Sequence, residues 1–201
     1  MTSHAAFDEA RVGSLITALV DSVARSYPDA AAGSSIPKGE KLTYFHSSVV
    51  QHSSVRSLVR ALVRARIALD WATAAMAVSL VMRYRRKKGD TSVTPHMLHR
   101  MMIGAMLVAA KAHQDVIPTN RLLAKTVNIV PAELSRMEAA FLHALDWRVN
   151  VDRSTIVEDE IELLRPVVGS PDSSPRLALS AAPSPCSVPV SLDAPWQLPV
   201  S

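Results

Sequence analysis

The amino-acid sequence predicts an all-α protein, and three observations support this fold class. Apolar residues make up 48% of the 201 residues, which is enough to bury one good core as a single domain with appendages. Only six glycines and three each of Phe, Tyr and Trp are available for turns and strands, whereas Ala, Leu, Val, Met and Arg are abundant. Apolar residues also recur three and four positions apart, which is the spacing of one face of a helix.

The first predicted helix covers residues 7–26. Acidic residues lie in its first turn, where the helix dipole favours them. Its apolar positions follow helical spacing and are Val12, Leu15, Ile16, Leu19 and Val23. Prolines, glycines and serines then cluster over Pro28–Gly39, which predicts a linker or an exposed loop. We therefore expect residues 1–40 to form an N-terminal helix and linker, followed by a compact domain over residues 41–164.

The compact domain is predicted to hold five helices, most of which are separated by residues that break or start a helix. The five ranges are Val55–Ile67, Asp70–Lys88, Thr94–Gln114, Pro118–Thr126 and Pro131–Trp147. Residues 165–201 follow them and contain eight of the thirteen prolines, many serines and almost no charge. Because so little apolar area could be buried there to offset the entropy of ordering, we expect this tail to be disordered.

The third and fifth of these helices each carry a charge at the edge of an apolar surface. The third is apolar nearly all round, which places it at the centre of a bundle, and Lys111 ends its buried stretch. In the fifth, Glu138 borders an apolar stripe made of Leu134, Met137, Phe141 and Leu145. A charge that loses its water costs several kcal/mol unless it finds a partner. We therefore expect Lys111 and Glu138 to meet each other or a bound protein.

Four segments of the chain carry a resemblance to a known family. They are FHS at Phe45–Ser47, HRMMIGAMLVAAK at His99–Lys111, NRLLAK at Asn120–Lys125 and AELSRMEAAFLHALDWRVNV at Ala132–Val151. In their order, spacing and flanking apolar residues, these segments resemble the cyclins, and within them the P/U-type cyclins named for their phosphate-regulon member. The resemblance covers about half of the chain and implies a single five-helix cyclin box.

The resemblance also implies a function. Such a chain is the regulatory subunit that binds and activates a cyclin-dependent protein kinase as a heterodimer, in cell-cycle progression or nutrient signalling. It docks the C helix of the kinase, with Lys111 and Glu138 contacting kinase backbone. The kinase-binding residues implied in this way are Lys111, Glu138, Val108, Ala112, Asp115, Leu142, Trp147 and Val149. The chain departs from the family at several positions. Among them, Ala112 replaces a bulky residue and Met82 replaces an Asp that braces an Arg of the first box helix.

The sequence contains no catalytic motif, and we expect neither enzyme activity nor a cofactor. It lacks a phosphate-binding glycine loop, an H-E-x-x-H motif and a G-x-S-x-G motif. Only His96 and His99 share a helical face, which is too few ligands for a metal site. The lone Cys186 favours a reducing intracellular compartment, the cytoplasm or the nucleus. Charges at Asp70 and Lys111 interrupt the two most apolar stretches, so no membrane span is expected.

Other functions stay open. The net charge of +4 would suit a helical module that binds nucleic acid, as general transcription factors with cyclin-like repeats do, although acidic residues interspersed among the basic ones disfavour it. A cyclin-like adaptor for some other protein is a further candidate. The basic run Arg83–Lys88 could serve nuclear import or an acidic partner, or could simply offset a helix dipole. Lys111 and Glu138 could likewise form an ordinary salt bridge of a helical bundle.

Overall fold

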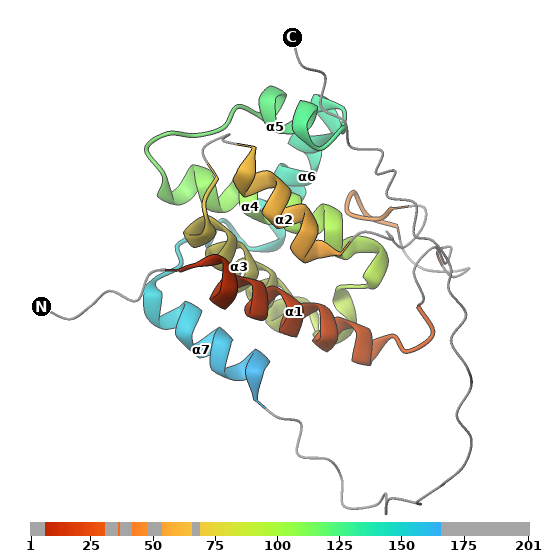
Figure 1. Ribbon diagram of the computed structural model, residues 1–201. Coiled ribbons are helices and arrows are strands. Elements are labelled where there is room, and N and C mark those ends of the chain that lie inside the picture. The colour runs from red at the N-terminus through yellow and green to blue at the C-terminus, as the bar shows by residue number, and fades with distance from the viewer. Residues whose placement is uncertain (1–6, 31–35, 37–41, 48–53, 66–68, 166–201) are drawn as a thin grey trace, which may run out of the picture. The chain divides into compact units, whose positions relative to one another are not determined.

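The computed structural model describes residues 7–30, 36, 42–47, 54–65 and 69–165, and these belong to one compact unit that ends at Pro166. The described residues form helices and no strand, so the predicted all-α class is confirmed (Figure 1). The helices are α1 (Glu9–Ser26), α2 (Val55–Arg64), α3 (Trp71–Lys88), the 3-10 helix η1 (Asp90–Ser92), α4 (Pro95–His113), α5 (Asn120–Thr126), α6 (Pro131–Ala144) and α7 (Arg153–Leu164). Residues 166–201, for which a disordered tail is predicted, lie outside the described part of the chain.

Helix α4 lies at the centre of this unit, as its apolar sequence predicts. Every residue of Met101–Ala110 is buried, and the helix packs against α1, α2, α3 and α6. On α6, the ring of Phe141 contacts those of Phe45 and Tyr84, with ring centroids 6.0 and 6.1 Å apart. This core fixes the end of α4, where Lys111 is the first exposed residue after the buried run.

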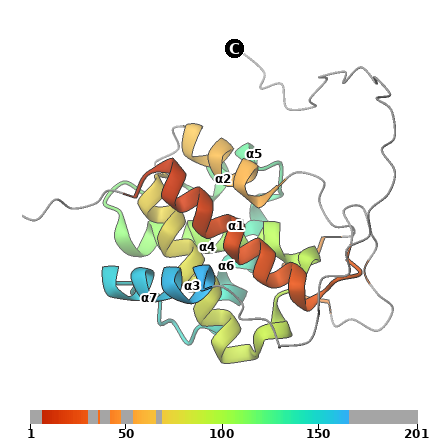
Figure 2. The same ribbon diagram turned by 60° about the horizontal axis from the view of Figure 1, so that its bottom comes forward.

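Helix α1 packs its apolar face into the same unit. All five of its predicted apolar positions are at most 2% exposed. Figure 2 shows α1 lying across α3 with α7 beside them, and these three helices contact one another pairwise. Ion pairs fix α1 at both sides, since Arg11 lies 2.5 Å from Glu160 of α7 and Glu9 lies 2.5 Å from Arg60 of α2.

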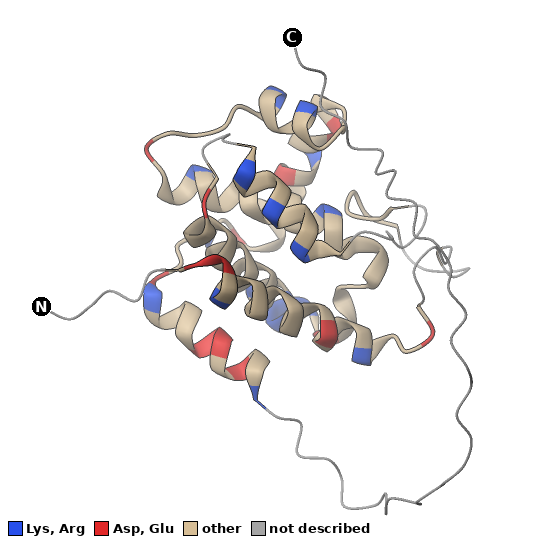
Figure 3. Ribbon diagram, in the orientation of Figure 1, with Lys and Arg blue, Asp and Glu red and all other residues tan. Residues whose placement is uncertain are grey.

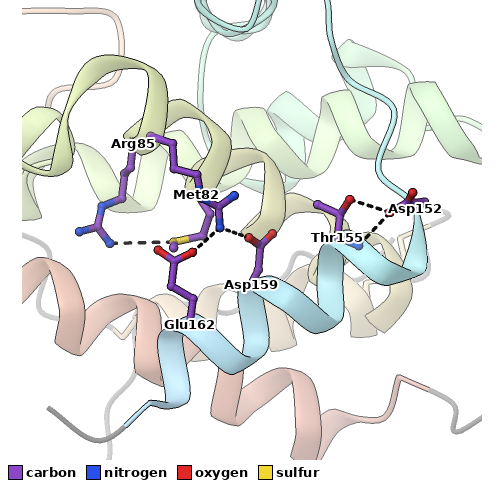
Figure 4. Close-up of polar contacts among 7 residues, drawn as sticks. Met82, Arg85, Asp152, Thr155, Asp159 and Glu162 are labelled. Carbon is purple, nitrogen blue, oxygen red and sulfur yellow. Dashed lines mark hydrogen bonds and ion pairs between the residues drawn. The ribbon is translucent and has the colours of Figure 1, made fainter. Parts of the chain in front are cut away.

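The sequence pattern does not predict helix α7. The side chain of Asp152 caps its start by accepting hydrogen bonds from the backbone N–H and the hydroxyl of Thr155, at 2.8 and 2.6 Å. Its buried residues are Ile156, Asp159 and Leu163. Figure 4 shows Asp159 and Glu162 directed toward the end of α3, where Arg86 forms ion pairs with both. An acidic residue in the middle of the buried face therefore hides the apolar spacing of this helix.

Helix α6 ends earlier than the predicted boundary at Trp147. It stops at Ala144, because Asp146 and Trp147 adopt left-handed backbone conformations with φ of 51° and 60°. The N–H of Trp147 donates to the carbonyl of Leu142 at 2.9 Å, which closes the helix end. The prediction of a helix through Trp147 is therefore wrong by three residues, and the indole lies on a turn.

The other helix boundaries differ from the predicted ones mainly at the caps. Asp70, Thr94 and Thr119 each precede a helix as its N-cap, so α5 starts two residues after Pro118. Helix α2 ends at Arg64, and the predicted end at Ile67 falls outside the described residues.

Candidate functional site

The two charged residues singled out by the sequence meet each other in the structure. Lys111 comes from the last turn of α4, and Glu138 from the middle of α6, one residue after buried Met137. The Lys111 Nζ lies 2.7 and 2.8 Å from the two carboxylate oxygens of Glu138. The side chains are 33% and 15% exposed, so the ion pair is reachable from solvent but partly shielded from it.

Asn120 at the start of α5 completes this arrangement. Its Nδ2 donates to Glu138 Oε2 at 2.9 Å and to the hydroxyl of Ser135 at 3.1 Å. The ion pair thus joins α4 to α6, and the amide joins α5 to α6. Since Asn120 contacts residues that follow it by 15 and 18 positions, local sequence patterns could not have assigned it this role.

The other residues implied to bind a kinase lie around this pair, with one exception. Ala112 and Asp115 are exposed just beyond Lys111, and Leu142 and Val149 are half-buried near the end of α6. Trp147 is 62% exposed. Val108 is only 2% exposed and belongs to the core. It offers almost no area to a partner and instead supports the last turns of α4.

Side chains of α3 and α4 fix the segment 145–151, which carries Trp147. Lys87 lies 2.5 Å from Asp146, and Arg83 donates to two backbone carbonyls of the segment at 2.5 and 3.0 Å. The Nε2 atom of His113 contacts the backbone of the same segment at 3.2 and 3.3 Å. The Trp147 ring rests edge-on against His143, with centroids 5.7 Å apart. The exposed indole therefore has a defined place.

Further apolar side chains near the pair were not singled out from the sequence. They lie in the loops around α5 and on α5 itself, and are Val116 at 71%, Ile117 at 45%, Leu122 at 45% and Val130 at 62% exposed. Large apolar side chains that gather on a surface mark binding sites for other proteins. A signal was present in the sequence, because the apolar residues Val116 and Ile117 directly precede Pro118, outside any helical spacing.

Several side chains of the fold have shifted pKa values with structural causes. A hydrogen bond from Lys87 lowers the pKa of Asp146. Hydrogen bonds from Thr155 lower the pKa of Asp152, and burial raises the pKa of Tyr84.

In the part of the chain that the structure describes, no three His, Cys, Asp or Glu side chains are grouped to hold a metal ion. No helix there is long and apolar enough to cross a membrane.

Comparison with known proteins identifies the family. The sequence model described as "Cyclin, N-terminal domain" matches residues 38–150, which is more than half of the chain and includes the whole candidate site. The chain is also 29% identical over 126 residues to the "Nuc-1 negative regulatory protein preg" of Neurospora crassa. That alignment covers 63% of this chain and 26% of the relative, so the chain spans about a quarter of the relative's length. The chain belongs to the cyclin family.

Proposed function

We propose that this chain is a single-box cyclin of the P/U type that binds and activates a cyclin-dependent protein kinase as a heterodimer. The observation that carries the proposal is the half-buried pair of Lys111 and Glu138, which lies beside exposed apolar side chains inside the segment matched by the family. Cyclins are regulators without catalysis of their own, and we assign no catalytic group, cofactor or metal to this chain.

The ion pair still has hydrogen-bond donors and acceptors available for a partner. The Lys111 ammonium has three N–H groups, and its contacts with Glu138 use at most two of them. The remaining N–H can donate to a backbone carbonyl of the kinase. A carboxylate offers about four acceptor positions, and Lys111 and Asn120 occupy only some of those on Glu138. Because both groups are already fixed, little side-chain entropy is lost when the kinase binds.

Apolar contacts would supply the affinity. Trp147 is the largest exposed side chain of the surface, with half-buried Leu142 and Val149 near it. Aromatic anchors of this kind contribute most to binding in protein interfaces. Ala112 presents a small side chain where the family generally has a bulky residue. Asp115 adds an exposed charged side chain three residues further along the chain.

Binding activates the kinase through differential affinity. The surface would fit the kinase better when its C helix is rotated inward than when it is rotated outward. A regulator shifts such a two-state equilibrium only by this difference in affinity. The inward helix completes the Lys–Glu ion pair that the kinase needs for phosphoryl transfer.

The name of the Neurospora relative describes a negative regulator, which supports a regulatory role for this chain. We place that role in cell-cycle progression or nutrient signalling, in the cytoplasm or the nucleus. An adaptor that uses the same surface for another protein is the competing function.

A charge swap tests the proposal, because it preserves the internal ion pair and inverts what a partner meets. In Lys111→Glu/Glu138→Lys, the two side chains still attract each other. We expect near wild-type thermal stability but loss of a co-purifying cyclin-dependent kinase and of its activity on a peptide substrate. The matched control is the swap Glu9→Arg/Arg60→Glu, which exchanges another pair at 2.5 Å away from the site.

The control swap should retain the kinase. Retention of the kinase by the Lys111/Glu138 swap would show that this pair only braces the fold. Recovery of other proteins, but no kinase, with the wild-type chain would favour the adaptor function.

A further inference from the structure

The surface formed by α5 and α6 has an excess of positive charge that no ion pair among the described residues neutralises. Both acidic residues of these helices are engaged from α4, since Glu133 pairs with Arg100 and Glu138 pairs with Lys111. The cations of α5 and α6 are Arg121, Lys125 and Arg136, all exposed and without an ion-pair partner among the described residues. Figure 3 shows Lys and Arg positions along α5, on the part of the molecule farthest from the acidic helix α7.

These three cations lie on neighbouring parts of one surface. Arg121 and Lys125 are four residues apart and therefore share one side of α5. The hydrogen bond from Asn120 to Ser135 joins the two helices at the residues that directly precede Arg121 and Arg136. We name this surface the cationic α5–α6 face.

The face also suits the close approach of a helix. The exposed side of α6 carries small residues at helical spacing, namely Ala132, Ser135 and Ala139. Small residues allow the backbone of a packed partner to come near. Exposed Leu122 and Val130 add apolar area at its edge. The face is continuous with the candidate kinase site, because Asn120 belongs to both.

We propose that the cationic α5–α6 face binds an acidic helical segment of the partner kinase, adjoining the segment held by Lys111 and Glu138. The inference rests on the proposed function and extends it by naming the charge of the partner surface. Three unpaired cations attract carboxylates during encounter, which raises the association rate and makes it depend on salt.

An acidic protein segment fits this face better than nucleic acid does. Strongly salt-dependent binding to duplex DNA can involve about six to ten phosphate contacts, whereas this face offers three cations. The small and apolar residues between those cations suit the packing of a helix and have no use against a phosphate backbone.

The experiment compares two charge reversals of equal size in the full chain. The test variant is Arg121→Glu/Lys125→Glu/Arg136→Glu, and the control is Arg25→Glu/Arg64→Glu/Arg165→Glu, which alters exposed cations outside α5 and α6. Circular dichroism first establishes that both are folded. Association and dissociation rates are then measured against the cyclin-dependent kinase recovered with the wild-type chain, at about 0.05 and 0.5 M NaCl.

We expect the test variant to bind about tenfold more weakly or worse at low salt, mainly through slower association, with less salt dependence than wild type. The control should change affinity by less than about threefold. Replacing acidic residues of the docked kinase segment by Lys should restore binding to the test variant.

Other outcomes overturn the inference. If the wild-type chain binds the kinase and the test variant associates equally fast, the inference fails while the proposed function stands. If the wild-type chain binds no kinase, both fail. A fluorescein-labelled DNA duplex provides the last arm: salt-dependent binding that only the test variant loses, with kinase binding unchanged, would assign the face to nucleic acid.

Discussion

Trp147 is exposed because the backbone leaves α6 early, and two consecutive residues carry the resulting strain. Asp146 and Trp147 both have positive φ, which costs an L-residue about 1 kcal/mol or more. Contacts from Lys87 and Arg83 on α3 offset this cost by fixing the side chain of Asp146 and two carbonyls of the same segment. A partner therefore meets an indole that is already oriented, which lowers the entropy lost on binding.

The pH dependence of this turn can be predicted from Asp146. Lys87 lowers the pKa of its carboxyl below the ordinary 3.8, so the ionised group stabilises the fold at neutral pH. This stabilisation is lost as the pH falls through the lowered pKa. Asp146→Asn should therefore have a lower Tm than wild type above about pH 4, and the difference should vanish toward pH 2. Asn tolerates the left-handed conformation as well as Asp does, so backbone strain is unchanged.

Thermal unfolding followed by circular dichroism between pH 2 and 7 measures this difference. Asp29→Asn removes an exposed carboxylate outside the turn and serves as the control. A Tm difference between wild type and Asp146→Asn that is the same at every pH would contradict an electrostatic origin.

Individual site residues were predictable only where local spacing decides their exposure. Lys111 follows ten apolar or small residues on α4, and Glu138 borders the buried stripe of α6, so both were expected at the edge of packed surface. Val108 was placed by resemblance on the binding surface, but it packs inside the core. The contact of Asn120 with Glu138 depends on how α5 crosses α6, which no local pattern contains.

At the scale of elements, the central helix was predictable and the last one was not. Helix α4 is apolar on all sides, so the centre of a bundle is the position that buries every side of it. Helix α7 buries three residues, and the middle one is Asp159, whose charge is matched by Arg86 from α3. The end of α6 was missed for a related reason, since no glycine marks the left-handed turn at Asp146.

The ion pair between α3 and α7 should be sensitive to loss of its basic partner. Asp159 is 1% exposed in its side chain and Arg86 is 44% exposed. Arg86→Ala would leave a buried carboxylate without a counter-charge. We expect it to lower the free energy of unfolding by about 2–3 kcal/mol, less than for a fully buried pair because water reaches the guanidinium. Urea denaturation measures this change.

The control for this prediction is Arg11→Ala, which breaks the pair with Glu160 at 2.5 Å. It leaves a carboxylate whose side chain is 18% exposed, against 1% for Asp159, and should cost about 1 kcal/mol or less. Arg86→Ala/Asp159→Asn removes the uncompensated charge and should recover part of the loss. Equal effects of Arg86→Ala and Arg11→Ala would mean that Asp159 is better hydrated than its burial indicates.

At the scale of the whole molecule, most basic residues of α3 form ion pairs or hydrogen bonds with other parts of the fold. Arg83 holds backbone carbonyls of the segment 145–151, Arg86 binds α7, and Lys87 pairs with Asp146. Arg85 is 5% exposed and donates to Ser22 of α1. This engagement favours a structural role for the basic run over nuclear import, whereas the three cations of the cationic α5–α6 face have no ion-pair partner among the described residues.

The domain edge can be tested with two truncations, because α1 and α7 lie outside the residues matched by the family yet pack against each other and α3. A chain ending after Arg165 keeps Leu163, the last buried residue of α7, and should unfold within about 2 °C of wild type. A chain ending after Val151 exposes the apolar partners of Ile156 and Leu163 and leaves Arg11 and Arg86 unpaired. We expect its Tm to fall by about 6 °C or more. Calorimetry of both chains decides the matter, and a large loss in the longer one would move the domain edge into residues 166–201.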